Sequence, residues 1–228
     1  MQFYLLSVFA ADLISIRIDG SKDGDNLSDQ WLPKFKCNLG GKQRVDNLHM
    51  DNVKPLLLGS VLSDNNLVHF KHLVISTFTA TPFHAYGRLW GCKLRRHDSL
   101  TIIDSKNILQ WEWRCSRFAN IELTRSTVFD NQLDRRFYEL LDPQLKFLSI
   151  ISCKLKRIQE NVFREAPEIE ALRIVANGIG ALRESAFKTP MPKLWLLDFS
   201  RNKIKLIEAE LFTGMPVISK HFLSLIRI

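Results

Sequence analysis

The C-terminal third of the chain repeats a single pattern of apolar and polar positions. Each unit places six anchor residues at the same intervals, with two alternating apolar residues first and a phenylalanine last. The first anchors of three complete units and of a fourth, incomplete unit that begins at His221 are 24, 25 and 24 residues apart. Because several anchors keep their phase over three units, the pattern indicates a true internal repeat. The anchors of the complete units are Leu148, Ile150, Cys153, Leu155, Ile158 and Phe163; Leu172, Ile174, Asn177, Ile179, Leu182 and Phe187; and Leu197, Phe199, Asn202, Ile204, Ile207 and Phe212.

The spacing inside each unit predicts a short strand followed by a return path. Alternating residues such as Leu172 and Ile174 point to one face of a strand. The later anchors Ile179, Leu182 and Phe187 bring the chain back over the same core. One unit cannot bury this apolar face alone, whereas stacked neighbours can. The pattern therefore predicts a solenoid whose strands pair in parallel.

The repeat resembles the leucine-rich repeat family, whose pattern is L-x-x-L-x-L-x-x-N-x-L. Residues 145–155, 169–179 and 194–204 follow this pattern, and the resemblance covers about residues 145–228. It implies an α/β solenoid, a right-handed coil with a parallel β-sheet on its concave face. The period of 24 residues and the trailing phenylalanine are similar to the extracellular type of these repeats.

A column of buried polar residues is expected where the strands end. Asn177 and Asn202 occupy the asparagine site of the pattern, and Cys153 occupies it in the first complete unit. Their side chains would satisfy backbone groups that the bend leaves unpaired, so losing one should cost about 1–3 kcal/mol. A thiol is compact and a weak donor, which suits Cys153 to the same ladder.

The upstream sequence is less regular. Apolar pairs recur at unequal intervals, and only the last of them, near residues 121–147, keeps enough of the pattern to count as a degenerate unit. The earlier pairs are either irregular units or chance in a chain rich in leucine and isoleucine. The pairs are Leu56 and Leu58, Leu73 and Ile75, Leu100 and Ile102, and Ile121 and Leu123.

These patterns divide the chain into four predicted regions. Residues 1–18 are a candidate signal peptide, and residues 19–53 form a lead-in or N-terminal cap region. Residues 54–144 hold the degenerate repeats, with an irregular insertion near residues 85–113. Residues 145–228 hold the regular repeats, and the last of these is incomplete: His221 takes the first anchor position and Ile226 the asparagine position.

Composition and charge exclude several classes of protein. Of 228 residues, 46% are apolar and 25% charged, which is typical of a globular chain and not of a disordered one. No apolar run reaches about 18 residues, so no transmembrane helix is expected. The net charge of +8 is diffuse, and no nucleic-acid motif accompanies it. One local cluster is either a solvated basic surface or a contact for an acidic glycan, and it consists of Lys93, Arg95, Arg96 and His97.

The apolar N-terminus and the sequon at Asn26 both fit an extracellular protein, since a sequon matters only in a secreted chain. With Cys153 assigned to the repeat, three cysteines remain, which permit one disulfide, expected between Cys92 and Cys115. No C-x-x-C pattern, metal-binding cluster, catalytic motif or cofactor motif is present. We therefore expect no enzyme activity, no metal and no cofactor.

The predicted functional surface is the concave face, where side chains between the core anchors point away from the core. Exposed aromatic residues near arginine are typical of protein–protein contacts. The alternative is that flanking loops or the N-terminal half cover this face. The expected contact residues are Phe147, Ser149, Arg173, Trp195, Leu196, Asp198 and Phe222.

Three functions remain open at this point. The first is a secreted module that recognises another protein through this face. The second is a non-catalytic accessory subunit of a secreted enzyme complex. Here residues 194–198 and 210–215 are loosely similar to secreted arthropod repeat proteins related to the non-catalytic subunit of Oplophorus luciferase. The third is an intracellular repeat adaptor.

Overall fold

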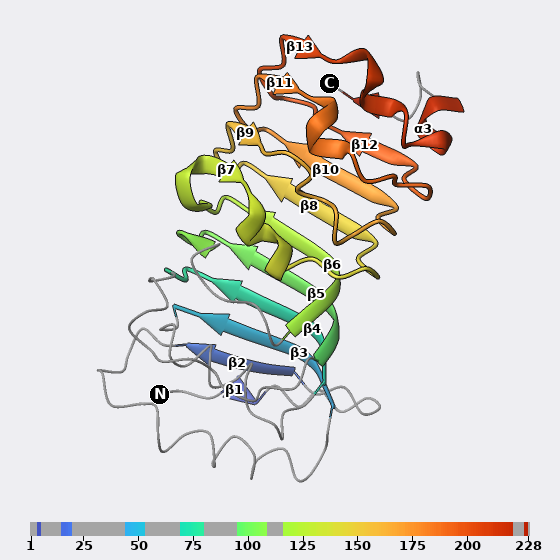
Figure 1. Ribbon diagram of the computed structural model, residues 1–228. Coiled ribbons are helices and arrows are strands. Elements are labelled where there is room, and N and C mark those ends of the chain that lie inside the picture. The colour runs from blue at the N-terminus through green and yellow to red at the C-terminus, as the bar shows by residue number, and fades with distance from the viewer. Residues whose placement is uncertain are drawn as a thin grey trace.

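Ten strands form one long sheet in the part of the chain that the structure describes (Figure 1). The strands lie in the sheet in chain order, and every neighbouring pair is parallel except β1 and β2. The computed structural model describes residues 4–5, 15–19, 44–52, 69–79, 95–108, 116–220 and 226–227. The strands are β1 (Tyr4–Leu5), β2 (Ser15–Asp19), β3 (Arg44–Asp51), β4 (His69–Ser76), β5 (Arg95–Ile103), β6 (Ser116–Thr124), β8 (Phe147–Ile151), β10 (Ala171–Val175), β12 (Leu196–Asp198) and β14 (Ile226–Arg227).

A second layer of short elements lies opposite this sheet and encloses the core (Figure 1). Within it β7 pairs with β9 and β11 with β13, both in parallel. The elements are β7 (Gln132–Leu133), β9 (Arg157–Ile158), β11 (Ala181–Leu182), β13 (Leu206–Ile207), the 3₁₀ helices η3 (Phe129–Asn131), η4 (Arg135–Glu139), η5 (Glu184–Phe187) and η6 (Ala209–Phe212), and the α-helix α3 (Pro216–Lys220).

The predicted parallel-strand solenoid is confirmed, and its helical part is mostly 3₁₀ among the described residues. The short period of the repeat explains why these helices are 3₁₀ and not α. A 3₁₀ helix rises about 2.0 Å per residue against about 1.5 Å for an α-helix, so it spans the return path with fewer residues.

The core anchors lie in register from strand to strand. The first anchors of β8, β10 and β12 are direct partners, and each is at most 1% exposed. The same row continues upstream through β6, β5, β4 and β3, so the irregular apolar pairs on β4, β5 and β6 are genuine turns of the coil. The row is Leu48, Leu73, Leu100, Ile121, Leu148, Leu172 and Leu197.

The upstream boundaries differ in part from expectation. The prediction of an irregular insertion near residues 85–113 is wrong for β5, which pairs with β4 on one side and β6 on the other. The core residues of β3 are Leu48 and Met50, whereas the predicted pair Leu56 and Leu58 lies outside the described residues. The expected boundary between residues 18 and 19 falls within β2.

The predicted register of the last unit is wrong. The sequence pattern placed His221 opposite Leu197, but the residue of β14 that pairs with Leu197 is Ile226. Ile226 therefore occupies a strand position and not the asparagine site. The physical reason is α3, which begins at Pro216, because proline at the first position of a helix favours helix formation and the helix delays the strand.

The phenylalanines of the return path form a shorter column than the pattern suggests. The ring centroids of Phe163 and Phe187 are 5.3 Å apart, and Phe187 then meets Phe199 edge-on at 6.3 Å. Phe212 is partly buried against the same core. The aromatic contacts thus link the return path to the residue directly after β12 as well as to its neighbouring turn.

A polar ladder runs through the core just beyond the ends of the strands. Oδ1 of Asn177 accepts hydrogen bonds from the backbone N–H groups of Cys153 and Leu155 at 2.9 and 3.1 Å. Its Nδ2 donates to the carbonyls of Ile150 and Val175, both at 2.9 Å. One buried amide therefore satisfies four backbone groups on two adjacent turns.

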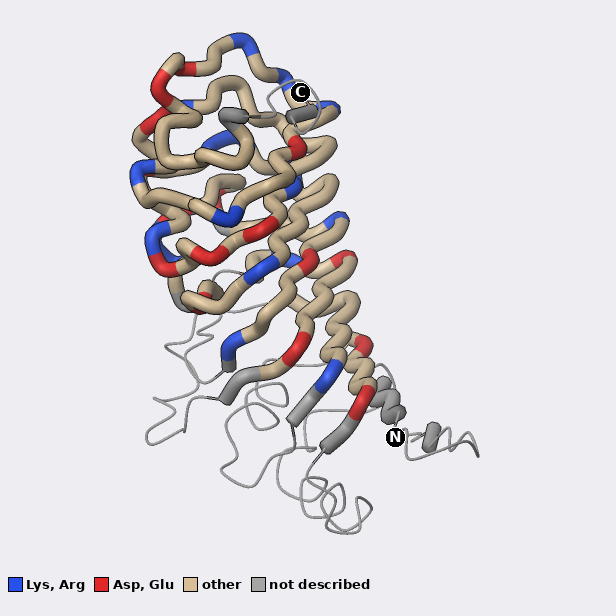
Figure 2. The backbone as a smooth tube through the Cα atoms, turned by 90° about the vertical axis from the view of Figure 1, so that its right-hand side faces the viewer, with Lys and Arg blue, Asp and Glu red and all other residues tan. Residues whose placement is uncertain are grey.

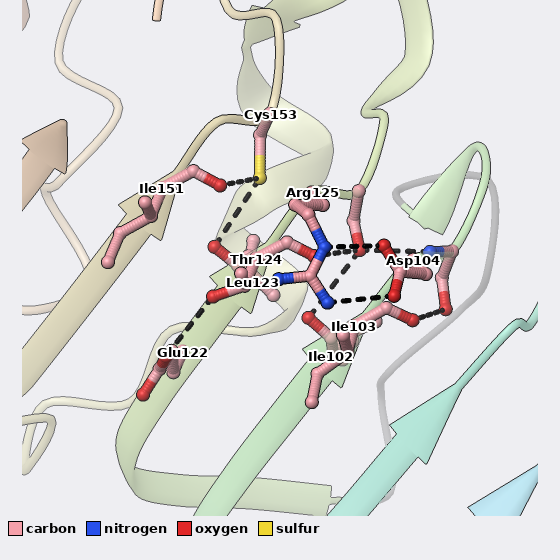
Figure 3. A network of polar contacts seen from close by, with 11 residues as sticks. Ile102, Ile103, Asp104, Glu122, Leu123, Thr124, Arg125, Ile151 and Cys153 are labelled. Atoms are coloured by element: carbon pink, nitrogen blue, oxygen red, sulfur yellow. Dashed lines mark hydrogen bonds and ion pairs between the residues drawn. The ribbon is translucent and has the colours of Figure 1, made fainter. Parts of the chain in front are cut away.

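Other residues hold the equivalent ladder positions in neighbouring turns. Asn202 accepts from the N–H of Ile179 at 3.2 Å and donates to the carbonyl of Ile174 at 2.5 Å. The thiol of Cys153 donates to the carbonyls of Leu123 and Ile151 (Figure 3). The ladder continues upstream through two buried serines that the sequence pattern did not indicate.

These serines make the same kind of contact with their neighbours. The hydroxyl of Ser126 donates to the carbonyl of Thr124 at 3.0 Å and accepts from the N–H of Ser105 at 3.1 Å. The hydroxyl of Ser105 in turn accepts from the N–H of Phe78 at 3.0 Å. Small hydroxyl side chains thus replace asparagine where the period is irregular.

One residue per turn adopts a left-handed backbone conformation where the strand ends. The φ angles of these residues lie between 48° and 59°, although none of them is glycine. In this conformation an N–H group can donate to the carbonyl at the end of the next strand, as Ser152 does to Val175 at 3.0 Å. The column consists of Asn52, Thr77, Asp104, Arg125, Ser152, Ala176 and Arg201.

Removing the amide of Asn177 should destabilise the coil far more than exchanging the thiol of Cys153. Asn177→Ala leaves four buried backbone groups unpaired, for an expected loss of about 3 kcal/mol in the free energy of unfolding. Cys153→Ser should change it by less than about 1 kcal/mol, because serine already serves this position in two turns. Urea unfolding measures both, and equal losses would contradict the ladder.

Glycine at the left-handed position should stabilise the protein. The left-handed conformation costs a residue other than glycine about 1–2 kcal/mol of conformational energy. Glycine avoids this strain, but its more flexible unfolded state lowers the free energy of unfolding by about 0.4–1 kcal/mol. Ala176→Gly should therefore raise the melting temperature modestly. Ala171→Gly, inside β10, serves as the matched control and should lower it. A drop in both variants would show that the backbone at Ala176 is unstrained.

Candidate functional site

The sheet positions that face away from the core form one continuous surface on β8, β10 and β12, which we call the concave face. The register aligns Phe147, Ala171 and Leu196 in a first row across the three strands. A second row aligns Ser149, Arg173 and Asp198. The strands fix these side chains side by side although they are more than 20 residues apart in the sequence.

Large apolar side chains are exposed at the start of these strands. Phe147 is 42% exposed and Trp195 43% exposed, whereas Ala171 on the strand between them is only 4% exposed. Leu196, next to Trp195, is half-buried. The backbone N–H of Trp195 donates to the carbonyl of Glu170 at 2.9 Å, which ties this residue to the neighbouring turn. The face thus presents two accessible aromatic rings on a rigid backbone.

Arg173 is held in place by a buried carboxylate. Its Nε donates to Oδ2 of Asp198 at 3.4 Å, while Oδ1 of Asp198 accepts from the backbone N–H and the hydroxyl of Ser200 at 3.0 and 2.7 Å. Burial raises the pKa of the Asp198 carboxyl, but the hydrogen bonds from Ser200 and Arg173 outweigh burial and keep it below its usual value.

Asp198 is therefore ionised at neutral pH. Only 3% of this expected contact residue is exposed, whereas its partner Arg173 is accessible. Asp198 positions the guanidinium of Arg173, which is exposed. The accessible charge on this row belongs to the arginine.

The remaining predicted contacts differ in accessibility. Ser149 lies between Glu122 and Arg173 in the register, and its buried hydroxyl oxygen has no hydrogen-bond partner among the described residues. Phe222 lies outside the described residues, and the strand that pairs with β12 begins at Ile226. The described part of the predicted surface thus comprises β8, β10 and β12.

Ion pairs between adjacent turns border the concave face. Lys146 pairs with Glu170 at 3.6 Å, and Lys193 pairs with Glu168 at 2.5 Å. The hydrogen bond to Glu168 and its negative charge both raise the pKa of Lys193. Figure 2 shows lysine, arginine and acidic residues interspersed along the described coil. The border therefore carries both signs of charge.

The N-terminal half of the sheet carries polar contacts that the sequence did not reveal. Nε2 of His49 lies 3.0 Å from the hydroxyl of Ser76, which itself donates to Asp51 at 2.8 Å. In a catalytic triad the carboxylate holds the histidine and not the serine. This cluster therefore joins β3 to β4 and does not have the geometry of an activated nucleophile.

One residue of the predicted basic cluster, His97, is not on the surface. His97 is buried, and its ring stacks on Phe118 with centroids 5.3 Å apart. It belongs to the packed interior and cannot serve as a surface cation. The side chains of Lys93, Arg95 and Arg96 lie outside the described residues.

Cys153 is the one cysteine among the described residues, and it forms no disulfide. Burial raises the pKa of the Cys153 thiol to about 11, so this residue stays protonated and acts as a ladder donor. Cys92, Cys115 and Asn26 lie outside the described residues. In the described ranges, no group of three or more histidine, cysteine or acidic residues is placed to hold a metal ion.

The stacked parallel strands and the polar ladder define a solenoid of repeated turns. The family model named Leucine rich repeat matches residues 167–224, which include β10, β12 and the last asparagines of the ladder. Such repeats are generally non-catalytic scaffolds that bind proteins. No curated protein and no solved structure matches the chain, so the similarity to the luciferase-related subunits gains no support.

No helix in the described ranges is both long enough and apolar enough to cross a membrane.

Proposed function

We propose that this protein is a non-enzymatic scaffold that binds another protein through the concave face of β8, β10 and β12. The observation that carries the proposal is the exposure of Phe147 at the start of β8 and of Trp195 directly before β12. Aromatic residues such as tryptophan, together with arginine, are enriched among the few residues that carry most of the binding energy of protein interfaces.

The layout of the face indicates the kind of partner. The backbones that carry Phe147 and Leu196 are about 10 Å apart, since adjacent strands lie about 4.8 Å from each other. Ala171 between them is covered by its neighbours, so an apolar side chain of the partner would pack on the accessible parts of Phe147 and Leu196. The guanidinium of Arg173, one row away, favours a partner carboxylate beside that apolar group. We infer an exposed apolar segment with an adjacent acidic residue.

We further propose that the protein works outside the cell. The support is the apolar N-terminal segment, the sequon at Asn26 and the 24-residue period of the repeat. Two alternatives are kept for the tests below. A non-catalytic accessory subunit would share the concave face but bind a catalytic chain, and an intracellular adaptor would lack the glycan.

Truncating the exposed ring or the guanidinium should weaken binding without unfolding the coil. Trp195→Ala and Arg173→Ala should each weaken partner capture by about tenfold or more, as expected for residues at the centre of an interface. Leu206→Ala is the matched control, because Leu206 is 45% exposed on β13, away from the concave face. Affinity capture followed by mass spectrometry, with a melting curve for each variant, measures the effect.

Equal capture by all three variants would reject the concave face as the binding site. Recovery of one catalytic chain in fixed proportion, lost with Trp195→Ala, would identify the accessory-subunit alternative.

The proposed location is tested by expressing the tagged chain in eukaryotic cells. We expect the protein in the medium, with a glycan that glycosidase removes and that the Asn26→Gln variant lacks. The physical reason is that only a chain translocated into the secretory pathway meets the glycosylation machinery at its sequon. Protein confined to the cell lysate, with the same mass before and after glycosidase, would favour the intracellular adaptor.

A further inference from the structure

Three arginines from two adjacent turns line a hollow on the side of the coil opposite the main sheet. Arg135 and Arg136 belong to η4, and Arg164 belongs to the return path of the following turn. Together with Tyr138 they line a surface hollow of about 560 Å³ that is largely open to solvent. This volume lies in the range of small-molecule sites, which measure roughly 300–1,000 Å³. The hollow is separate from the concave face and does not depend on its proposed function.

The walls of the hollow are fixed by contacts between the two turns. The hydroxyl of Tyr138 donates to the carbonyl of Asn161 at 3.2 Å. The guanidinium carbon of Arg164 lies 4.5 Å from the centre of the Tyr138 ring, as in a cation–π contact. These contacts hold the second turn against η4, so the site exists before any ligand arrives.

Arg136 is also held in a defined orientation. Asp134, the N-cap of η4, accepts from the backbone N–H of Arg136 at 2.9 Å and from its Nε at 3.0 Å. The carboxylate of Asp134 is buried and also contacts Nη2 of Arg136. Fixing one guanidinium in advance lowers the conformational entropy that an anion has to overcome on binding.

Acidic side chains neutralise the arginines around the hollow only in part. Asp134 compensates Arg136, and Glu165 accepts from Nε of Arg164 at 2.7 Å. The latter pair is exposed on both sides and is therefore weak and replaceable. Arg135 is exposed and makes no hydrogen bond or ion pair with the described residues. One guanidinium is thus uncompensated and a second is held only by a weak surface pair.

We propose that this hollow binds the sulfate or phosphate group of a small ester ligand such as an anionic sugar. Guanidinium groups bind tetrahedral oxyanions through paired, charge-assisted hydrogen bonds. The cavity is larger than a free anion requires, so the group that carries the ester, such as a sugar ring, occupies the remaining volume beside Tyr138. The proposal assigns the oxyanion to Arg135 and Arg164, with Arg136 oriented beside them.

The test is isothermal titration calorimetry of the full chain at low ionic strength, where charge interactions are weakly screened. The probes are inorganic sulfate, inorganic phosphate, glucose 6-phosphate and N-acetylglucosamine 6-sulfate, with neutral glucose as the blank. Sugar esters should bind more tightly than the inorganic anions. The relative affinities of the two esters distinguish a phosphate source from a sulfate source.

The variants separate a built site from general positive charge. Arg135→Gln combined with Arg164→Gln should weaken ester binding by about tenfold or more, since two charge-assisted contacts are lost. Arg183→Gln combined with Arg201→Gln removes the same charge from exposed positions outside the hollow and should leave affinity unchanged. Arg135→Gln alone should retain the fold, because this side chain has no partner among the described residues, and should weaken binding severalfold.

The proposal is overturned if no probe gives saturable heat, or if both double variants weaken binding equally. It is also overturned if glucose binds as tightly as its phosphate ester. None of these results bears on the concave face, because Phe147, Arg173 and Trp195 are unchanged in every variant.

Discussion

No turn of this coil can bury its apolar strand face without the turns beside it. Every other feature depends on the in-register stacking of short parallel strands, in which leucine or isoleucine meets its counterpart on both sides. The hydrophobic gain comes from excluding water between these side chains, and it is realised only when several turns are present. Hydrogen bonds between strands and the polar ladder then satisfy the backbone groups that stacking buries.

Stacking constrains the strands but leaves the return path free to vary. Between β3 and β14, residues that are partners in the sheet lie from 21 to 29 positions apart in the sequence, yet the register of the core row is kept. Differences in length are taken up on the opposite side of the coil, by 3₁₀ turns and by α3. The ladder adjusts with them, because a serine, a thiol or an amide each satisfies a different number of backbone groups.

Both candidate binding sites follow from the rigidity of this scaffold. On the concave face, β10 and β12 place Arg173 beside Asp198, and burial of the carboxylate makes it a support for the arginine. On the opposite side, η4 and the next return path place Arg135 and Arg164 at one hollow. In each case the chemistry is assembled from residues of adjacent turns, which no single segment of sequence contains.

The repeat in the sequence determined the solenoid, the core row of the regular turns and the positions of Asn177 and Asn202, because a fixed period leaves only one way to bury the apolar face. The tertiary structure alone decided what depends on contacts between turns. It moved the last strand to Ile226, extended the ladder to Ser105 and buried His97. Such contacts join residues more than 20 positions apart, and their geometry depends on the return path, whose length and conformation the apolar period does not specify.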